Sequence, residues 1–158
     1  MKLFVDRDLG PAIGRALQAV GVDAVNHVEV FRPDEDDAVW IRAVTAEERV
    51  ILSKDKHLRS RPAEREAFEA AGARCFVLTS EGQNRLSLLR NLLASWDEIA
   101  AREATVPAPF MYGIARDGRL TQWIPRGGEG SPTERARATE ARRRSRRGGP
   151  LQDDLTRG

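Results

Sequence analysis

Apolar runs and helical patterns alternate along the N-terminal two thirds of the chain. Four runs rich in Val, Leu, Ile and Phe predict strands, at residues 2–8, 23–28, 49–55 and 73–79. Apolar residues recur at helical spacing between and after these runs, and Gly or Pro often marks the ends of the elements. The predicted helices lie at residues 11–20, 34–44, 62–71 and 80–99.

This alternation predicts an α/β fold, in which a mainly parallel central sheet is covered by helices on both faces in a three-layer sandwich. Right-handed crossovers place the carboxyl ends of the parallel strands along one edge of the sheet. The period changes after Pro109. The segments 110–115 and 120–124 flank Asp117-Gly118, a strong turn signal, and predict a C-terminal β-hairpin.

The helix at residues 80–99 has the most regular amphipathic pattern. Ser80, followed three residues later by Gln83, has the arrangement of a capping box. The apolar positions that follow define the face expected to be buried, and they are Leu86, Leu89, Leu93, Trp96 and Ile99.

Composition divides the chain near residue 125. Residues 126–158 contain nine Arg against five acidic residues, so the net charge of +2 leaves residues 1–125 at about −2. The C-terminal segment has almost no large apolar residues, and we expect a disordered basic tail after one domain at residues 1–125. No apolar run approaches the roughly 20 residues of a membrane span, and no leader pattern precedes the first strand, so a soluble, cytoplasmic protein is expected.

Acidic residues stand at the ends of two predicted strands and at the start of the helix between them. Asp6 ends the first strand, Asp55 ends the third, and Asp34 to Asp37 open the intervening helix. The carboxyl ends of strands in open α/β sheets border the crevice that binds ligands. Clustered carboxylates suit a hard cation, which near a phosphodiester stabilises the attacking and leaving oxygens and helps to generate hydroxide. The pattern indicates one acidic pocket for phosphodiester hydrolysis.

Ordinary structural roles account for the same residues. Asp34 can cap a helix, and Asp36 and Asp37 fall in the first turn, where the helix dipole favours anions. An Asp directly after a strand is also a common turn residue. If the carboxylates serve only as caps and turns, the domain is a non-catalytic RNA- or protein-binding module.

The order of these motifs resembles PIN-like nuclease domains, and more closely the shorter branch that includes VapC-type toxin relatives. The resemblance covers residues 1–80 well and extends loosely through the hairpin. It rests on Leu3-Phe4-Val5-Asp6, Asp37 before Trp40-Ile41, Leu52-Ser53-Lys54-Asp55, and Arg59-Ser60-Arg61-Pro62-Ala63-Glu64. It implies a metal-dependent endoribonuclease of the toxin type that cleaves RNA. An antitoxin protein and a second copy of the chain are the protein partners that we expect.

The resemblance also implies site residues. Asp6, Asp37 and Asp55 match the family's acids and would bind Mg²⁺ or Mn²⁺, with Asp36 as the alternative to Asp37 because predicted helix ends are inexact. The family often has a fourth acid where this chain has His57, and Glu64 is the nearest substitute. The residues expected to support the site or to bind substrate are Asp8, Asp36, Ser53, Lys54, Arg59, Arg61 and Glu64.

A receiver-type phosphoacceptor is a further alternative. Asp55 would then be phosphorylated, and Asp6 with Asp8 would hold Mg²⁺. Such a site needs a Lys at a later strand end, and no Lys follows Lys56, which argues against it.

Overall fold

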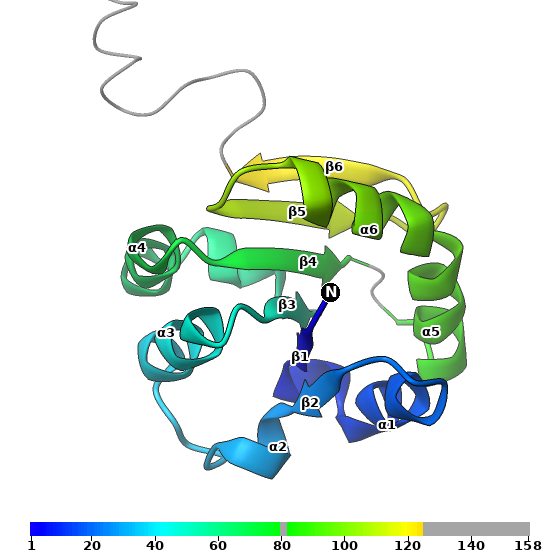
Figure 1. Ribbon diagram of the computed structural model, residues 1–158, viewed down its shortest axis with the longest axis horizontal. Coiled ribbons are helices and arrows are strands. Elements are labelled where there is room, and N and C mark those ends of the chain that lie inside the picture. The colour runs from blue at the N-terminus through cyan, green and yellow to red at the C-terminus, as the bar shows by residue number, and fades with distance from the viewer. Residues whose placement is uncertain (80–81, 125–158) are drawn as a thin grey trace, which may run out of the picture. The chain divides into compact units, whose positions relative to one another are not determined.

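The computed structural model describes residues 1–79 and 82–124. In this part of the chain six strands form one sheet in the order β2-β1-β3-β4-β5-β6, and each neighbouring pair is parallel except β5 and β6 (Figure 1). The strands are β1 (Leu3–Val5), β2 (Ala24–Asn26), β3 (Val50–Ser53), β4 (Arg74–Leu78), β5 (Phe110–Ile114) and β6 (Leu120–Ile124). The predicted α/β class, mainly parallel sheet and C-terminal hairpin are confirmed.

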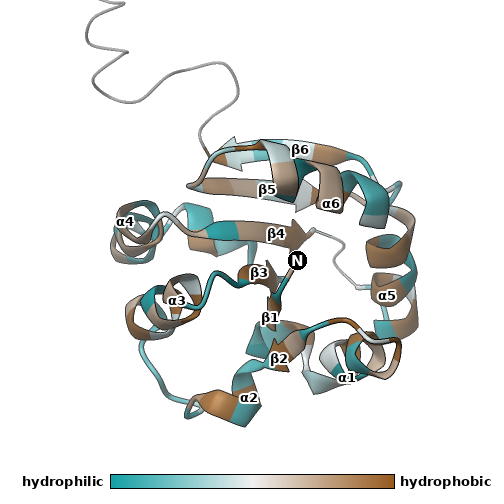
Figure 2. Ribbon diagram, in the orientation of Figure 1, coloured by the Kyte–Doolittle hydropathy of each residue, from teal (hydrophilic) through white to brown (hydrophobic). Residues whose placement is uncertain are grey.

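Helices cover both faces of this sheet, which confirms the three layers. The α-helices are α1 (Pro11–Ala19), α2 (His27–Val30), α3 (Asp37–Ala46), α4 (Pro62–Ala71), α5 (Arg85–Ala94) and α6 (Trp96–Thr105), and two 3₁₀ turns are η1 (Arg7–Leu9) and η2 (Lys56–Arg59). Leu17 of α1, Leu92 of α5 and Ile99 of α6 belong to one core cluster. Trp40 of α3 and Phe68 of α4 belong to the second, on the opposite face. In Figure 2 the strands β4 and β5 are largely hydrophobic, because both of their faces are buried.

The pairing of β1 with β3 positions the candidate site. Val5 lies opposite Leu52, and the amide of Asp6 donates to the carbonyl of Leu52 at 2.9 Å. The chain therefore leaves the two strands at neighbouring points, at Asp6 and just after Ser53. The strand order also reverses here, because β2 lies beyond β1 on one side and β4 beyond β3 on the other. Open α/β sheets bind ligands in the crevice at such a reversal.

The predicted helix at residues 80–99 is wrong in its bounds. Helix α5 begins after Asn84, whose side chain accepts from the amide of Ser87 at 2.9 Å, and Ser80 lies outside the described residues. The helix is interrupted at Ser95, which is buried. The Ser95 hydroxyl lies 2.9 Å from the carbonyl oxygen of Asn91 and 3.0 Å from that of Gly118 in the β5–β6 turn. These contacts stabilise the break at Ser95, and a separate helix, α6, begins at Trp96.

The buried face of α5 also differs from the prediction. Leu86 and Leu93 are 67% and 51% exposed, whereas Leu88 and Leu92 are buried. The predicted face assumed one continuous helix. Its members Ile99, which is buried, and Leu89 and Trp96, which are partly buried, do pack into the core. Because the chain is interrupted at Ser95, α5 and α6 bury their faces independently.

The second predicted strand is shorter than residues 23–28. It ends at Asn26, which forms a capping box with Glu29 and so starts α2. The expected tail at residues 126–158 and its boundary near 125 lie outside the described residues and stay predictions. Within the described ranges, no helix has both the length and the apolar character that crossing a membrane requires.

Two neighbouring leucines test the corrected face of α5. Leu92→Ala should lower the free energy of unfolding by about 2–5 kcal/mol, because it leaves a cavity in the core. Leu93→Ala is the matched control and should change it by no more than about 0.5 kcal/mol, since this side chain is largely exposed. Urea denaturation followed by circular dichroism measures both, and equal losses would contradict the assignment.

Candidate active site

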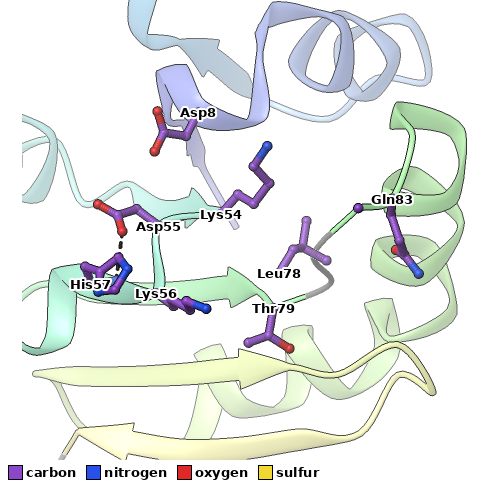
Figure 3. Close-up of a pocket in the computed structure, with 9 residues that line it drawn as sticks. Asp8, Lys54, Asp55, Lys56, His57, Leu78, Thr79 and Gln83 are labelled. Carbon is purple, nitrogen blue, oxygen red and sulfur yellow. Dashed lines mark hydrogen bonds between the residues drawn. The ribbon is translucent and has the colours of Figure 1, made fainter.

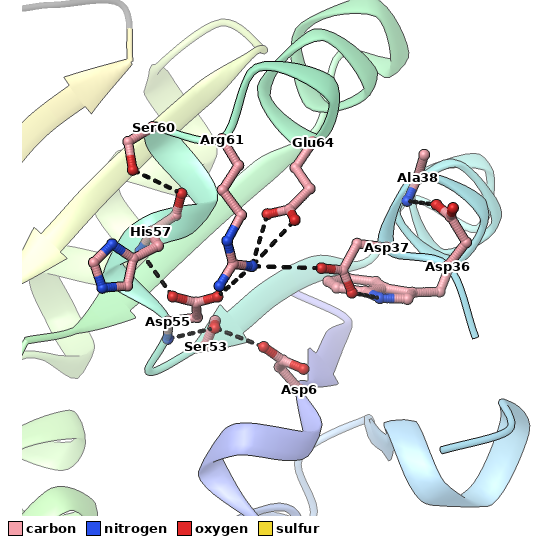
Figure 4. Close-up of polar contacts among 11 residues, drawn as sticks. Asp6, Asp36, Asp37, Ala38, Ser53, Asp55, His57, Ser60, Arg61 and Glu64 are labelled. Atoms are coloured by element: carbon pink, nitrogen blue, oxygen red, sulfur yellow. Dashed lines mark hydrogen bonds and ion pairs between the residues drawn. The ribbon is translucent and has the colours of Figure 1, made fainter. Parts of the chain in front are cut away.

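A buried hydrogen-bonded chain joins the ends of β1 and β3. The Ser53 hydroxyl donates to Asp6 Oδ2 at 2.7 Å and accepts from the backbone amide of Asp55 at 2.9 Å (Figure 4). Ser53 is fully buried and Asp6 is 8% exposed. The small hydroxyl residue therefore fixes the distance between the two aspartates, and its place two residues before Asp55 gives it this role.

Asp55 is held at the start of η2. Its Oδ1 accepts from the backbone amide of His57 at 2.8 Å, so the carboxylate caps this 3₁₀ turn. Its Oδ2 lies 3.1 Å from Nη1 of Arg61. One oxygen of Asp55 thus orients the side chain, and the other contacts Arg61.

Two adjacent acids at the start of α3 have different roles. Asp36 is the N-cap residue, and its carboxylate accepts from the amide of Ala38 at 2.7 Å. Asp37 accepts from the indole nitrogen of the buried Trp40 at 2.8 Å, and its Oδ2 lies 3.9 Å from Arg61 Nη1. Asp37 therefore faces Arg61, whereas Asp36 stabilises the helix end.

Arg61 lies among these carboxylates. Its Nη1 is 3.1 Å from Asp55 and 3.1 Å from each oxygen of Glu64, in addition to its contact with Asp37 (Figure 4). Arg61 directly precedes α4, and Glu64 lies in the first turn of that helix. We call Asp6, Asp37, Asp55 and Glu64 the acidic cluster. Glu64, the substitute for the family's fourth acid, thus contacts the same cation as Asp37 and Asp55.

Burial and nearby negative charges raise the pKa of two members of the acidic cluster, Asp6 and Glu64. Burial raises the pKa of Asp6 to about 6, with further increases from the negative charges of Asp8 and Asp37, against the opposing hydrogen bond from Ser53. Burial likewise raises the pKa of Glu64, and the charges of Asp37 and Asp55 add to this effect while Arg61 opposes it. The hydrogen bond to Glu64 and the charge of Asp55 raise the pKa of Arg61, which stays protonated.

Two hollows border the acidic cluster. One, of about 300 Å³, has the side chains of Asp55, Lys54 and Lys56 in its wall (Figure 3). It is completed by Asp8, His57, Leu78, Thr79, Gly82 and Gln83. The other, of about 430 Å³, includes Asp37 and Glu64. The first hollow carries both lysines, so it is the side of the cluster better suited to a phosphate.

The remaining predicted residues lie around rather than within the cluster. Asp8 and Lys54 line the first hollow. Arg59 stacks on Trp123 of β6, with its guanidinium carbon 4.2 Å from the ring centroid, so it does not join Arg61. The sequence patterns missed this stacking and the position of Arg61 among three carboxylates. Only the spacing of Arg61 and Glu64, three residues apart before and within a helix, could have indicated their pairing.

The side chains of the acidic cluster have the donor atoms for a hard cation, although they do not form a ready-made metal site. Within residues 1–79 and 82–124, no three His, Cys, Asp or Glu side chains are arranged so that they could hold one ion as they lie. The donor chemistry does fit a hard cation, because three carboxylates surround one cationic nitrogen and Mg²⁺ prefers oxygen ligands. Asp6, Asp37, Asp55 and Glu64 are the residues that would hold such an ion.

Comparison with known proteins identifies the family. The model of the PIN-like domain matches residues 1–80, which carry β1 to β4 and all four members of the acidic cluster. The chain belongs to the PIN-like domain family. This is a nuclease-type family whose members typically use divalent metals, and membership supports a hydrolase. Searches of curated proteins and of solved structures gave no match.

The raised pKa of Asp6 predicts a pH-dependent stability. A carboxyl with a higher pKa in the folded state than in the unfolded state removes stability as pH rises from about 4 to about 6. Asp6→Asn should therefore unfold with a free energy about 1–3 kcal/mol higher than the wild type at pH 8, and with an equal one at pH 4. Urea denaturation at both pH values measures the difference.

Proposed function

We propose that this chain is a metal-dependent endoribonuclease that hydrolyses RNA phosphodiester bonds at the acidic cluster. The observation that carries the proposal is the meeting of Asp37, Asp55 and Glu64 around one cationic nitrogen, beside the buried Asp6, at the reversal point of the sheet. Capping alone does not explain four carboxylates at one edge, because Asp37 accepts from the Trp40 indole and Glu64 pairs with Arg61.

Each residue of the site has a role in this proposal. Asp6, Asp37 and Asp55 supply the oxygen ligands, and Glu64 adds negative charge at the same place. Ser53 positions Asp6 relative to Asp55. Bound Mg²⁺ or Mn²⁺ would supply stabilisation of charge on the phosphate oxygens and acidification of the attacking water.

The wall of the first hollow supports RNA as the substrate. Lys54 and Lys56 flank Asp55 on both sides in the sequence and line this hollow together with it. Ammonium groups that contact phosphates position a nucleic acid strand without reading its sequence. A strand bound there would present a phosphodiester beside Asp55.

We further propose that the chain acts as the toxin of a toxin–antitoxin pair, with an antitoxin protein as its partner. This part rests on the resemblance of residues 1–80 to the VapC-type branch. The arginine-rich residues 126–158 offer a basic segment for contact with RNA.

Neighbouring aspartates test the assignment of the site. Asp37→Asn and Asp55→Asn should each lower the rate of Mg²⁺-dependent cleavage of total RNA by at least about 100-fold, because each removes a charged ligand. Asp36→Asn is the matched control and should retain the rate, since Asn caps a helix as well as Asp does. If purified wild-type protein cleaves no RNA, or if Asp55→Asn cleaves as fast, the chain is a non-catalytic binding module instead.

Removal of residues 125–158 tests the tail. The truncated chain 1–124 should keep the circular dichroism spectrum of the full chain, because β6 ends at Ile124. Its affinity for RNA should fall at low salt and differ little at high salt, since the lost contacts are electrostatic. Equal affinities at both salt concentrations would remove this role from the tail.

A further inference from the structure

The acidic cluster of this protein already contains a cationic side chain, that of Arg61. One atom, Arg61 Nη1, lies within 3.9 Å of oxygens from Asp37, Asp55 and Glu64. A divalent ion held by these carboxylates needs ligand distances near 2.1 Å and would compete with that nitrogen for the same oxygens. The Oδ1 atoms of Asp55 and Asp37 already accept from the His57 amide and the Trp40 indole, so the metal would need the Oδ2 atoms that Arg61 contacts.

We propose that Arg61 is the resident counter-ion of the acidic cluster, and that a divalent cation binds only by displacing its guanidinium. The inference rests on the proposed function and adds to it a residue that sets the metal affinity. In the metal-free chain, Arg61 offsets the repulsion among the carboxylates. When a metal occupies the acidic cluster, the Arg61 guanidinium moves away from the carboxylates.

The exposure of Arg61 makes this exchange accessible. Its side chain is 49% exposed, whereas those of Asp55 and Glu64 are 15% and 18% exposed. Ion pairs with a partly exposed partner are weak, because water screens them and the long side chain loses freedom. Asp37 and Asp55 are held by Trp40 and by the backbone of His57, whereas the half-exposed arginine can leave into solvent.

The released guanidinium can bind a phosphate group of the RNA. Arg61 directly precedes α4 and contacts Asp55, which lines the first hollow together with Lys54. A planar guanidinium forms paired hydrogen bonds with phosphate oxygens. The exchange thus converts Arg61 from a partner of the carboxylates into a ligand for the RNA backbone, and it does so only when the metal is present.

Metal titration of the full-length protein tests the exchange without any measurement of cleavage. Isothermal titration calorimetry with MnCl₂ should show that Arg61→Gln binds Mn²⁺ about tenfold more tightly than the wild type, because the competing charge is gone. Arg61→Lys keeps the charge and should bind within about twofold of the wild type. Arg65→Gln is the matched control, one turn further along α4, where Arg65 pairs with Glu69 at 2.8 Å outside the cluster. It should leave the affinity unchanged.

One double variant and one measurement of thermal stability complete the test. The double variant Arg61→Gln/Asp55→Asn should lose the gain, which assigns the bound Mn²⁺ to the acidic cluster. Mn²⁺ should also raise the thermal midpoint of Arg61→Gln more than that of the wild type, a readout that confirms a folded variant.

Equal or weaker Mn²⁺ binding by folded Arg61→Gln, or no binding by either protein, would overturn the counter-ion role. RNA cleavage by the wild type would then still support the nuclease. Tighter binding by Arg61→Gln, with no cleavage by any variant, would support the counter-ion role and overturn the nuclease.

Discussion

Repulsion between carboxylates at neutral pH is the constraint on which this site depends. The parallel pairing of β1 with β3 brings Asp6 and Asp55 to one edge, and α3 and α4 add Asp37 and Glu64. The fold offsets the repulsion in two ways. Asp6 has a raised pKa and a hydrogen bond from Ser53, and the other three carboxylates share the charge of Arg61.

Buried side chains and the backbone orient Asp6, Asp37 and Asp55, whereas the side chain of Arg61, which offsets the charge of Asp37 and Asp55, is half exposed. Ser53 is buried between two strands, Trp40 is buried beneath Asp37, and Asp55 caps a 3₁₀ turn. Asp6, Asp37 and Asp55 are therefore each oriented by a contact that does not involve Arg61. In the proposed exchange these three carboxylates keep their places while a divalent cation replaces the guanidinium.

Much of this arrangement could be predicted from local patterns. Buried strands that end in Asp6 and Asp55 are short apolar runs followed by an acid, and the sheet rules then place both at one edge. The choice between Asp36 and Asp37 could not be made, because it depends on where α3 begins to within one residue. The break at Ser95 was missed because it is held by Gly118, which is distant in the sequence. The position of Arg61 was missed for the same reason, since a long side chain follows tertiary charge and not local periodicity.

The central claim is that the acidic cluster binds a divalent cation in exchange for Arg61. A crystal structure of the full-length protein grown with Mn²⁺, with anomalous data collected for manganese, tests it most directly. The account predicts an anomalous peak bounded by the oxygens of Asp37 and Asp55, with the Arg61 guanidinium turned away from both. A cluster that keeps the Arg61 ion pairs and shows no peak at saturating Mn²⁺ would contradict it.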